Sequence, residues 1–447
     1  MTIKQASKIH VVGISGIGTS AVAQWLLSLG KKVTGSDLRA TDLSARIEKK
    51  GAEITFGDHK AENVPNDAEM IIFSPAIPAN NPERVKAQEN DLTELSYPQA
   101  LAELSHNYYK IAVSGTHGKT TTTAMLANIF IQAGLDPTVV VGSIISDWRS
   151  NFRLGKGKYL IFEADEYAKS FMHYQPDSVI VLNIDNDHLD TYSDLEDIIA
   201  TFKQFVEKLP DHGFCILNAD NDNSISLASA TQAQVKKYSL LKPDKIDWQQ
   251  KGMSIEADLP NLGKATIPVV GEHNLSNTLA ALTAAQALEV DNLAIKKGLE
   301  TYQGTWRRFE IMGQMNNSTI ISDYAHHPTE IAATIKAAKQ AFPDQSIVII
   351  YQPHQKRRTK LLFTEIVEAL KLSDKIYVTD IYDVAGRDNE NDSVTAQDIV
   401  KKIDQAEYIT ELNAGNEVIK SLLKEKNIII FMGAGSIHKM ALEIIGK

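Results

Sequence analysis

The sequence predicts an α/β protein with mostly parallel sheets, divided among more than one domain. Short runs rich in valine and isoleucine recur along the chain, and those at residues 9–12, 111–113 and 427–432 each lead into a glycine turn. The first two turns are followed by apolar residues at helical spacing, which is the strand–turn–helix order of parallel sheets. A chain of 447 residues is also too long for one core, so we expect two to four domains.

The composition is that of an ordinary globular protein, with 43% hydrophobic and 23% charged residues. A net charge of −10 argues against nucleic acid as the main partner. The single cysteine, Cys215, excludes an intrachain disulfide and favours a reducing compartment, and we expect its side chain to be buried. Since we find neither a signal peptide nor an apolar run of about 18 residues, we expect a cytoplasmic protein without a membrane partner.

The stretch from Lys110 to Phe130 carries the strongest functional signal. A strand, a turn with two glycines and a helix together form the arrangement that holds nucleotide phosphates on backbone N–H groups. Lys119 would contact the phosphates, and the Thr120 hydroxyl would bind Mg²⁺. The candidate ATP-binding residues of this stretch are Gly115, Thr116, His117, Gly118, Lys119, Thr120 and Thr121.

This turn is shorter than the common phosphate-binding pattern G-x-x-x-x-G-K-[ST]. Gly115 lies three residues before Gly118, where the pattern requires five. The alternative is a helix N-terminus that carries Gly-Lys-Thr by chance. The coincidence of strand, turn and helix signals favours the phosphate site.

The first third of the chain contains a Rossmann-like strand–helix–strand unit that ends at Asp37. Its glycines follow the order G-x-x-G-x-G, which differs from the dinucleotide fingerprint and weakens an NAD interpretation. A diphosphate on the turn at Gly16 and Gly18 remains compatible, because it needs only close backbone approach and a helix N-terminus. Asp37 would then meet a sugar or base edge, or serve only as a turn residue. The loop from Ser74 to Pro82 follows another strand and is either a ligand-binding loop or a rigid connector.

Two later strands end in acidic segments. The strand at 159–162 leads into Glu163 and Glu166, and the strand at 178–184 leads into an acidic segment that includes His188. Both ends should lie beside the nucleotide strand, where carboxylates suit Mg²⁺ or Mn²⁺. We favour Glu163 and His188 as ligands over Glu166, and the alternative is a solvated acidic loop.

Residues 232–270 lose the strand–helix rhythm and are predicted to form an antiparallel appendix. In the helix that follows, Asn274 and Asn277 share one face and suit a purine edge, although helix capping is the alternative. The last third is a further α/β unit. Several cationic groups fall at its strand ends and indicate an anion site; zinc is disfavoured because neither an H-x-x-x-H pair nor a cysteine accompanies them. They are His326, His327, His354, Arg357 and Arg358.

Together these motifs resemble the Mur ligase family. The matching segments are Gly-Thr-His-Gly-Lys-Thr-Thr, Glu-Ala-Asp-Glu, Asn-Ile-Asp-x-Asp-His-Leu-Asp-Thr-Tyr, Gly-x-His-Asn-x-x-Asn, Arg-Arg-Phe, Asp-Tyr-x-His-His-Pro-Thr-Glu and Gln-Pro-His. The resemblance implies three domains: a UDP-sugar-binding Rossmann-like domain (1–104), a central ATPase domain of the P-loop type (105–305) and a C-terminal Rossmann-like ligase domain (306–447). It is closest to the members that use ATP to join L-alanine to the lactyl carboxylate of UDP-N-acetylmuramate, in peptidoglycan precursor synthesis.

The resemblance also implies roles for individual residues. Lys119 would contact the phosphates, and Thr120, Glu163 and His188 would hold Mg²⁺. The residues expected to contact ATP elsewhere are Asn274, Asn277, Arg308 and Asp323. Those expected to place the amino acid are His327, His354 and Arg358, with His327 a candidate proton acceptor. Those expected to hold the UDP-sugar are Gly16, Gly18, Ser36, Asp37 and Ser74.

Two departures from the family pattern matter. Gln355 replaces an arginine of the expected carboxylate clamp, and Tyr167 and Lys169 stand where small or acidic residues are common. Three alternatives stay open: a ligase that recycles a whole murein tripeptide onto the same UDP-sugar, an NAD(P)-dependent oxidoreductase, and a non-catalytic nucleotide switch. We expect a monomer or a weak homodimer.

Overall fold

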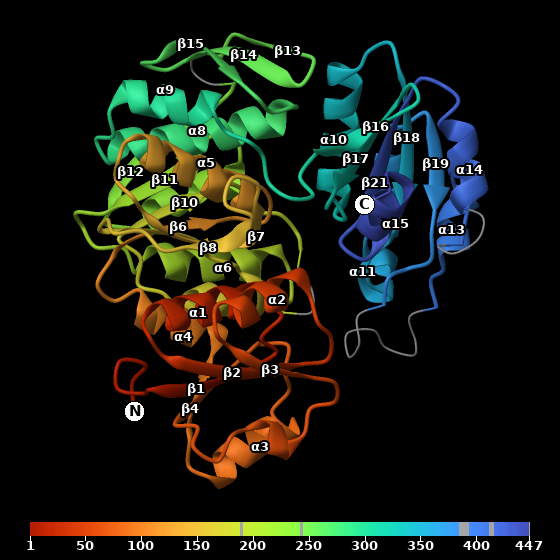
Figure 1. Ribbon diagram of the computed structural model, residues 1–447. Helices are drawn as coiled ribbons and strands as arrows, with labels where there is room; N and C mark the ends of the chain where they lie inside the picture. The colour runs from red at the N-terminus through yellow and green to blue at the C-terminus, as the bar shows by residue number, and fades with distance from the viewer. Residues whose placement is uncertain (188–190, 242–244, 384–392, 411–414, 447) are drawn as a thin grey trace. The chain divides into compact units, whose positions relative to one another are not determined.

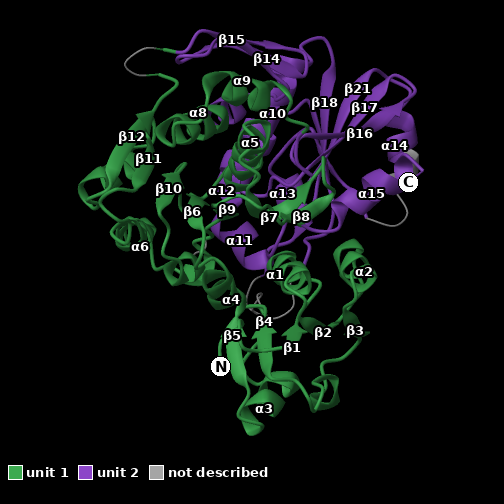
Figure 2. Cartoon of the chain, turned by 60° about the vertical axis from the view of Figure 1, so that its left-hand side comes forward, with its two compact units in different colours: residues 1–245, 277–303 green, residues 246–276, 304–447 purple. Residues whose placement is uncertain are grey.

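The computed structural model describes residues 1–187, 191–241, 245–383, 393–410 and 415–446 (Figure 1). Within these residues the strands form four β-sheets, and the chain divides into two compact units (Figure 2). The first unit comprises residues 1–245 and 277–303, and the second comprises residues 246–276 and 304–447. The predicted α/β class with mostly parallel sheets is confirmed. The predicted domain boundaries stay a prediction.

The first sheet of unit 1 has five parallel strands in the order β3-β2-β1-β4-β5. Its strands are β1 (Lys8–Val12), β2 (Lys32–Asp37), β3 (Glu53–Phe56), β4 (Met70–Phe73) and β5 (Thr93–Ser96). Its helices are α1 (Ile17–Ser28), α2 (Asp42–Lys49), α3 (Pro82–Glu89) and α4 (Tyr97–Leu104). The strand order reverses between β1 and β4, and ligands bind open α/β sheets at such a reversal. Val12 pairs with both Ser36 and Phe73, so the segments after β1, β2 and β4 begin at one edge.

The second sheet of unit 1 has seven strands in the order β12-β11-β10-β6-β9-β7-β8. Its strands are β6 (Tyr109–Ser114), β7 (Thr138–Ile145), β8 (Ser150–Arg153), β9 (Tyr159–Glu163), β10 (Ser178–Val181), β11 (Phe214–Asn218) and β12 (Gln234–Tyr238). Figure 1 shows α5 (Lys119–Gln132) and α6 (Leu195–Val206) on opposite faces of it. As predicted, the glycine-turn strand β6 lies between the strands with acidic ends, β9 and β10, and runs parallel to both.

Unit 2 contains a three-stranded antiparallel sheet and a six-stranded sheet in the order β16-β17-β21-β18-β19-β20. The small sheet consists of β13 (Trp248–Lys251), β14 (Ser254–Leu259) and β15 (Gly263–Ile267). It confirms the antiparallel appendix in part: β12, which was expected to belong to it, instead extends the parallel sheet of unit 1 beside β11. The sheet that β12 joins depends on the strand with which it pairs, and the local sequence does not encode that pairing.

The six-stranded sheet is parallel except for its edge pair, β16 and β17. Its strands are β16 (Glu310–Met315), β17 (Ser318–Asp323), β18 (Ser346–Tyr351), β19 (Lys375–Val378), β20 (Ala406–Tyr408) and β21 (Asn427–Met432). The helices of unit 2 include α10 (Pro328–Ala341), α11 (Lys356–Leu361), α12 (Phe363–Leu370), α13 (Ala396–Val400), α14 (Gly415–Leu422) and α15 (Ile437–Ile444). All six residues of β21 are buried, as an apolar run covered on both faces requires.

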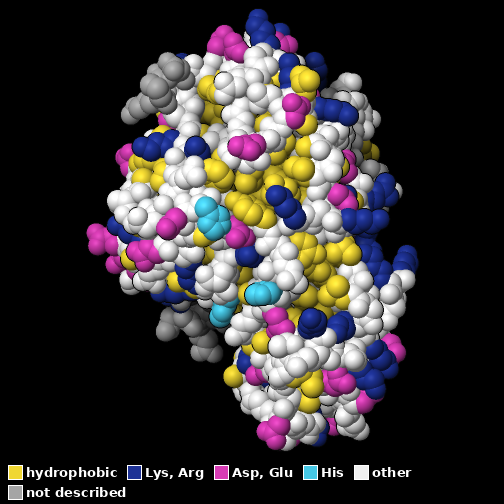
Figure 3. All heavy atoms as spheres, turned by 90° about the vertical axis from the view of Figure 1, so that its left-hand side faces the viewer, with side chains coloured by type: hydrophobic (Ala, Val, Ile, Leu, Met, Phe, Trp, Pro, Cys, Tyr) yellow, Lys and Arg dark blue, Asp and Glu magenta, His cyan; other side chains and the backbone are white. Residues whose placement is uncertain are grey.

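The structure bears on two expectations from the sequence: the burial of Cys215 and the absence of a membrane-spanning helix. Cys215 is buried in β11, and burial raises the pKa of its thiol to about 12, so it packs as a small apolar side chain as predicted. No helix among the described residues is both long enough and apolar enough to cross a bilayer. Figure 3 shows acidic and basic side chains interspersed on the face it presents.

A buried carboxylate ties the first sheet together. Both oxygens of Glu83 on α3 accept hydrogen bonds, from His10 Nε2 (2.9 Å), Ser36 Oγ (2.6 Å), His59 Nδ1 (2.7 Å) and Asn63 Nδ2 (3.0 Å). These donors come from β1, β2 and the segment after β3. Burial by itself would raise the pKa of Glu83, but the four hydrogen bonds outweigh burial and lower the pKa to about 2. Glu83 is therefore an anion that holds three segments of the sheet in place.

We predict that Glu83→Gln destabilises the protein by about 3 kcal/mol at pH 7, because an uncharged amide replaces the anion at the centre of the network. A lowered pKa adds stability above the unfolded value of about 4.5, and that stability is lost as the pH falls towards 2. The difference between wild type and variant should therefore shrink as the pH falls below about 4.5. Urea denaturation at pH 7 and pH 3.5 measures it.

The control is Glu89→Gln, which alters an exposed carboxylate at the end of the same helix. It should change the stability by less than about 0.5 kcal/mol at either pH. Equal effects of the two variants, or a pH-independent effect of Glu83→Gln, would contradict the role assigned to the buried anion.

Candidate active site

The glycine turn between β6 and α5 depends on both of its glycines. Gly115 has φ +125° and Gly118 has φ +86°, which are backbone conformations that favour glycine. A Cβ on Gly115 would lie 2.9 Å from the carbonyl oxygen of Asn183, and one on Gly118 would collide with Oδ1 of Asn277. Gly118 is the N-cap of α5, so the first N–H groups of the helix begin at this turn.

The segment after β10 holds the turn in shape through Asn183. Its carbonyl oxygen accepts from Thr116 N (3.1 Å), its Oδ1 accepts from His117 N (2.8 Å), and its Nδ2 donates to the His117 carbonyl (3.1 Å). Asp185 N donates to Thr116 Oγ1 at 2.9 Å. Asn183 was not among the residues predicted to form the site. The signal that could have found it is an amide side chain at the end of a strand that neighbours the glycine turn.

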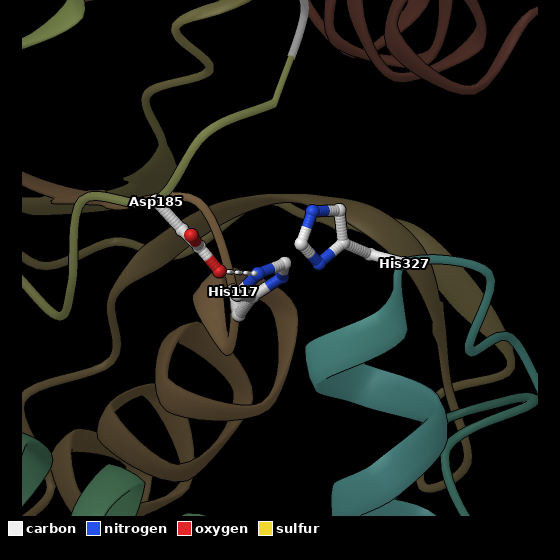
Figure 4. A group of neighbouring side chains, drawn as sticks. All are labelled: His117, Asp185 and His327. Atoms are coloured by element: carbon white, nitrogen blue, oxygen red, sulfur yellow. Dashed lines mark hydrogen bonds and ion pairs between the residues drawn. The ribbon is translucent and has the colours of Figure 1, made fainter. Parts of the chain in front are cut away.

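A further pair links the same two segments. Figure 4 shows His117, from the turn, and Asp185, from the segment after β10, joined between Nε2 and Oδ2 at 3.2 Å. With the Asn183 contacts, this pair fixes Thr116 and His117 of the turn to the segment that follows β10. The arrangement is preformed, which lowers the entropy lost on binding a ligand.

Lys119 is the first residue of α5, and its side chain folds back over the turn. Nζ donates to the carbonyls of Gly115 (2.7 Å) and Thr116 (3.3 Å) and to Glu166 (2.9 Å), with Asp165 at 3.6 Å. Burial would lower the pKa of this ammonium, but the carboxylates of Glu166 and Asp165 outweigh burial and hold the pKa above its ordinary value. Lys119 therefore stays a cation beside the turn, where it is paired with Glu166 and Asp165.

The other residues of unit 1 that are predicted to bind the metal ion or ATP either follow the turn directly in α5 or end a strand next to β6. Thr120 and Thr121 are the second and third residues of α5 and are buried. Glu163 ends β9, and its Oε1 accepts from Gly142 N of β7 at 2.7 Å. A Cβ on Gly142 would lie 2.8 Å from Glu163 Oε2, so the glycine leaves room for the carboxylate. His188 lies outside the described residues, and its role as a metal ligand stays a prediction.

Four of the residues predicted to bind the UDP-sugar lie at the end of β2 or just after β1 and β4, at the edge of the first sheet where the strand order reverses. Gly16 caps α1, and Asp37 Oδ2 accepts from Ser15 N at 2.9 Å, which gives this carboxylate a turn-closing contact. Ser74 follows β4, where its hydroxyl accepts from Ala76 N at 3.4 Å. Gly18 lies in the first turn of α1. Binding of a sugar nucleotide by these residues stays a prediction.

The fifth residue predicted to bind the UDP-sugar is Ser36, which is buried rather than exposed to a ligand. Its side chain is buried, and its hydroxyl donates to Glu83. Ser36 therefore has a structural partner in the network that supports the sheet, and its contact with a ligand also stays a prediction.

The two candidate asparagines of α8 (Glu272–Ala287) have different surroundings. Asn274, in unit 2, donates from Nδ2 to the carbonyl of Val270 at 2.9 Å. Asn277, in unit 1, is buried and lies against Gly118 of the glycine turn. Asn274 thus joins its helix to the preceding turn, whereas Asn277 borders the predicted phosphate site. Adenine binding by either residue stays a prediction.

In unit 2, Asp323 and the two arginines organise the segment before β16. Asp323 ends β17, and its carboxylate accepts from Phe309 N (2.7 Å) and Ala325 N (2.8 Å); burial raises the pKa of this carboxyl. Arg307 is buried and donates to the carbonyl of Gly433. Arg308 is half-buried, with Nη1 3.9 Å from Glu330. Arg308 is therefore the better placed of the two arginines to meet a ligand.

The candidate amino-acid residues lie at the ends of β17 and β18. His327 caps α10, and its Nδ1 accepts from Thr329 N at 3.3 Å. In the neutral ring Nε2 then carries the proton, so this hydrogen bond does not favour His327 as a proton acceptor. His354 stacks on Tyr382, with ring centroids 5.6 Å apart. Arg358 lies on α11, whose N-cap is Gln355 with φ +66°. Substrate roles for these residues stay predictions.

We predict that Gly118→Ala abolishes the stabilisation of the protein by Mg²⁺ and ATP, because the new methyl group collides with Asn277 at the predicted phosphate site. Thermal unfolding with and without the nucleotide measures this. The control is Gly30→Ala, whose φ of +76° imposes a similar backbone strain, of about 1 kcal/mol, with no atom within 4 Å of the new methyl group. An unaltered nucleotide-dependent shift in Gly118→Ala would contradict the assignment.

Three family models match the chain in sequence order. They are described as the Mur ligase family, catalytic domain (residues 8–109), the Mur ligase middle domain (113–285) and the Mur ligase, glutamate ligase domain (307–435). A curated relative, UDP-N-acetylmuramate–L-alanine ligase of Geotalea uraniireducens (strain Rf4), is 38% identical over 98% of each chain.

Solved structures of two related ligases match over 98% of both chains. A UDP-N-acetylmuramate–alanine ligase from Thermotoga maritima gives a TM-score of 0.83 at 28% identity. A murein peptide ligase from Psychrobacter arcticus 273-4 gives a TM-score of 0.71 at 24% identity, a likeness that concerns the fold. Matches to three consecutive Mur ligase family models, and to a relative over nearly the full length, show that this chain belongs to the Mur ligase family.

Proposed function

We propose that this protein is an ATP-dependent ligase that joins L-alanine to the lactyl carboxylate of UDP-N-acetylmuramate, in the synthesis of peptidoglycan precursors. The observation that carries the proposal is the preformed glycine turn, which Asn183 holds in place and which has the Lys119 ammonium over its centre. The relative that is 38% identical over 98% of the chain, and is named for this activity, supports the choice of substrates.

The reaction explains why such a turn is needed. A carboxylate is a poor acylating agent, so ATP must first convert it to an acyl phosphate, with ADP as the leaving group. The amine of the amino acid then attacks the acyl carbon, the amide bond forms, and inorganic phosphate leaves with the electron pair of the broken C–O bond. The substrate carboxylate and the γ-phosphate repel each other, and the fixed positive charge of Lys119 and the N–H groups at the start of α5 offset that repulsion.

A divalent cation fits the donors at this site. The Glu163 carboxylate at the end of β9 and the Thr120 hydroxyl at the start of α5 are hard oxygen donors, and Gly142 leaves the room that Glu163 occupies. Bound there, Mg²⁺ would supply charge neutralisation next to the phosphates; Mn²⁺ suits the same donors. Thr120 and Glu163 are the residues that would hold it, and His188 is the further ligand expected from the resemblance.

The residues of unit 2 would complete the reaction. Arg308 and Asp323 are assigned to ATP, and His354 and Arg358 to the carboxylate of the incoming amino acid, where Gln355 replaces a family arginine. If His327 accepts a proton from the attacking amine, its hydrogen bond from Thr329 N must first be released. A monomeric or weakly dimeric state and a cytoplasmic location complete the proposal, the latter favoured by a single buried cysteine.

We predict that the purified protein releases phosphate from ATP only when Mg²⁺, UDP-N-acetylmuramate and L-alanine are all present. A panel of amino acids, assayed with a coupled phosphate detector, measures acceptor choice, and we expect L-alanine to give the highest kcat/KM. Higher kcat/KM with the tripeptide L-alanyl-γ-D-glutamyl-meso-diaminopimelate would identify a recycling ligase instead. ATP binding without amide product would identify a nucleotide switch.

We further predict that Lys119→Ala lowers kcat by at least about 100-fold, because the variant loses the positive charge that offsets phosphate repulsion. Binding of UDP-N-acetylmuramate, measured by calorimetry, should be unchanged. The control is Lys237→Ala, which removes an exposed lysine from strand β12. Its turnover should equal that of the wild type. Near-normal turnover in Lys119→Ala would refute the assignment.

A further inference from the structure

One buried amide joins the two sheets of unit 1. Asn151 lies in β8 of the second sheet and is completely buried. Its Oδ1 accepts a hydrogen bond from Gln24 Nε2 at 2.9 Å. Its Nδ2 donates to Ser20 Oγ at 2.8 Å and to the carbonyl oxygen of Ile17. All three partners belong to α1, the helix that follows β1 of the first sheet, so Asn151 fixes the start of α1 on the second sheet.

Further contacts make this joint a network. Gln24 Oε1 accepts from Ser150 Oγ of β8 at 3.2 Å and from Lys50 Nζ, at the end of α2, at 2.8 Å. The side chain of Gln24 is buried, so water does not compete for these bonds. Trp25 of α1 stacks on Phe152 of β8, with ring centroids 5.6 Å apart. Helix α1 therefore has one defined position on β8.

The pairing of the strands in the second sheet relates this position to the glycine turn after β6. Phe152, the residue after Asn151, pairs with Val140 of β7. Val140 pairs in turn with Phe162 of β9, and Phe162 pairs with Ala112 of β6. A slip of any of these strands would break the pairing and turn its buried side chains to the other face of the sheet. The start of α1 is thus held at a fixed distance from the end of β6.

The start of α1 is also the predicted site of the substrate's diphosphate. Gly16 is the N-cap of α1, and Gly18 lies in its first turn. Ile17, whose carbonyl oxygen accepts from Asn151, lies between these two glycines. Asn151 therefore holds the backbone of the predicted diphosphate site from the side of the second sheet. Because its side chain is completely buried, it does not contact the substrate itself.

The reaction requires two such sites to be held at the right separation. Under the proposed function, the diphosphate lies at the start of α1 while the lactyl carboxylate of the same substrate meets the γ-phosphate of ATP at the glycine turn. A displacement of about 1 Å between reacting groups can lower a rate by about 100-fold. Resting on the proposed function, we propose that Asn151 is a positioning residue that sets the separation between the UDP-sugar site and the ATP site.

An asparagine suits this position because its side chain both accepts and donates hydrogen bonds. Aspartate would keep the acceptor for Gln24 but would have no N–H for Ser20 or for the carbonyl of Ile17. Alanine would leave all three groups without their partner in a buried place, where an unsatisfied polar group costs about 1–3 kcal/mol. We expect α1 to move on β8 until these groups find other partners, and the diphosphate site to move with it.

The test separates substrate binding from the chemical step in Asn151→Ala and Ser20→Ala. Phosphate release in a single turnover, at saturating ATP and L-alanine, should be slowed at least about 10-fold in Asn151→Ala and about threefold in Ser20→Ala, which loses one contact of the three. Dissociation constants for UDP-N-acetylmuramate and for a non-hydrolysable ATP analogue, each measured alone by calorimetry, should stay within twofold of wild type. Each of these two sites lies within one sheet, so a shift between the sheets leaves each site intact.

The matched control is Asn427→Ala, which removes a buried amide that donates to the carbonyl of Leu422 at 2.7 Å. Asn427 is the first residue of β21, at the opposite end of its sheet from the candidate amino-acid residues. This variant should have a lower melting temperature, as Asn151→Ala should, but an unchanged single-turnover rate.

A wild-type single-turnover rate in Asn151→Ala, or in Ser20→Ala if Asn151→Ala does not fold, would overturn the inference and leave Asn151 with a stabilising role alone. A loss of UDP-N-acetylmuramate binding that accounts for the slower rate would overturn it as well. If the wild-type protein binds these substrates but forms no amide, the proposed function fails, and the inference fails with it.

Discussion

The hydrogen bonds that Asn183 makes to the turn at Thr116 and His117 are the constraint on which the candidate site depends. A glycine turn by itself is a flexible segment that could adopt many conformations. Here one side-chain amide satisfies both a backbone donor and a backbone acceptor of the turn, and a backbone carbonyl satisfies a third group. The turn therefore has a fixed conformation before any ligand arrives, and binding need not include its ordering.

The parallel register of β9, β6 and β10 brings residues from three strand ends together around this turn. Val113 of β6 pairs with Glu163 of β9, and Ser114 of β6 pairs with Val181 of β10, so the three strands end at nearly the same level. Lys119 and the carboxylates after β9 consequently meet over one edge of the sheet, where the ion pairs of Lys119 are observed. Burial would lower the pKa of Lys119, and the carboxylates of Glu166 and Asp165 outweigh burial, so the ammonium stays charged beside them.

The sequence predicted the parts of this site that depend on neighbours along the chain. The glycine turn, Lys119 and the acidic ends of two strands follow from local spacing, and the parallel sheet brings them together as expected. Asn183, 66 residues from His117, acts through contacts that local patterns do not encode. The same holds for Ser36, whose hydroxyl is bonded to Glu83, 47 residues away. Strand β12 was misassigned for a similar reason, since its partner strand decides its sheet.

Glycines in this structure matter as much for the side chains they admit as for their own torsions. Gly118 admits Asn277, Gly142 admits Glu163 and Gly18 admits Tyr97, and the entering side chain always comes from a distant part of the chain. Gly18 and Gly142 do not have the positive φ that would require glycine, so turn geometry alone would permit alanine there. Close packing would not, because the added methyl group would occupy the space of the neighbouring side chain. The packing of these side chains therefore depends on residues that lack side chains themselves.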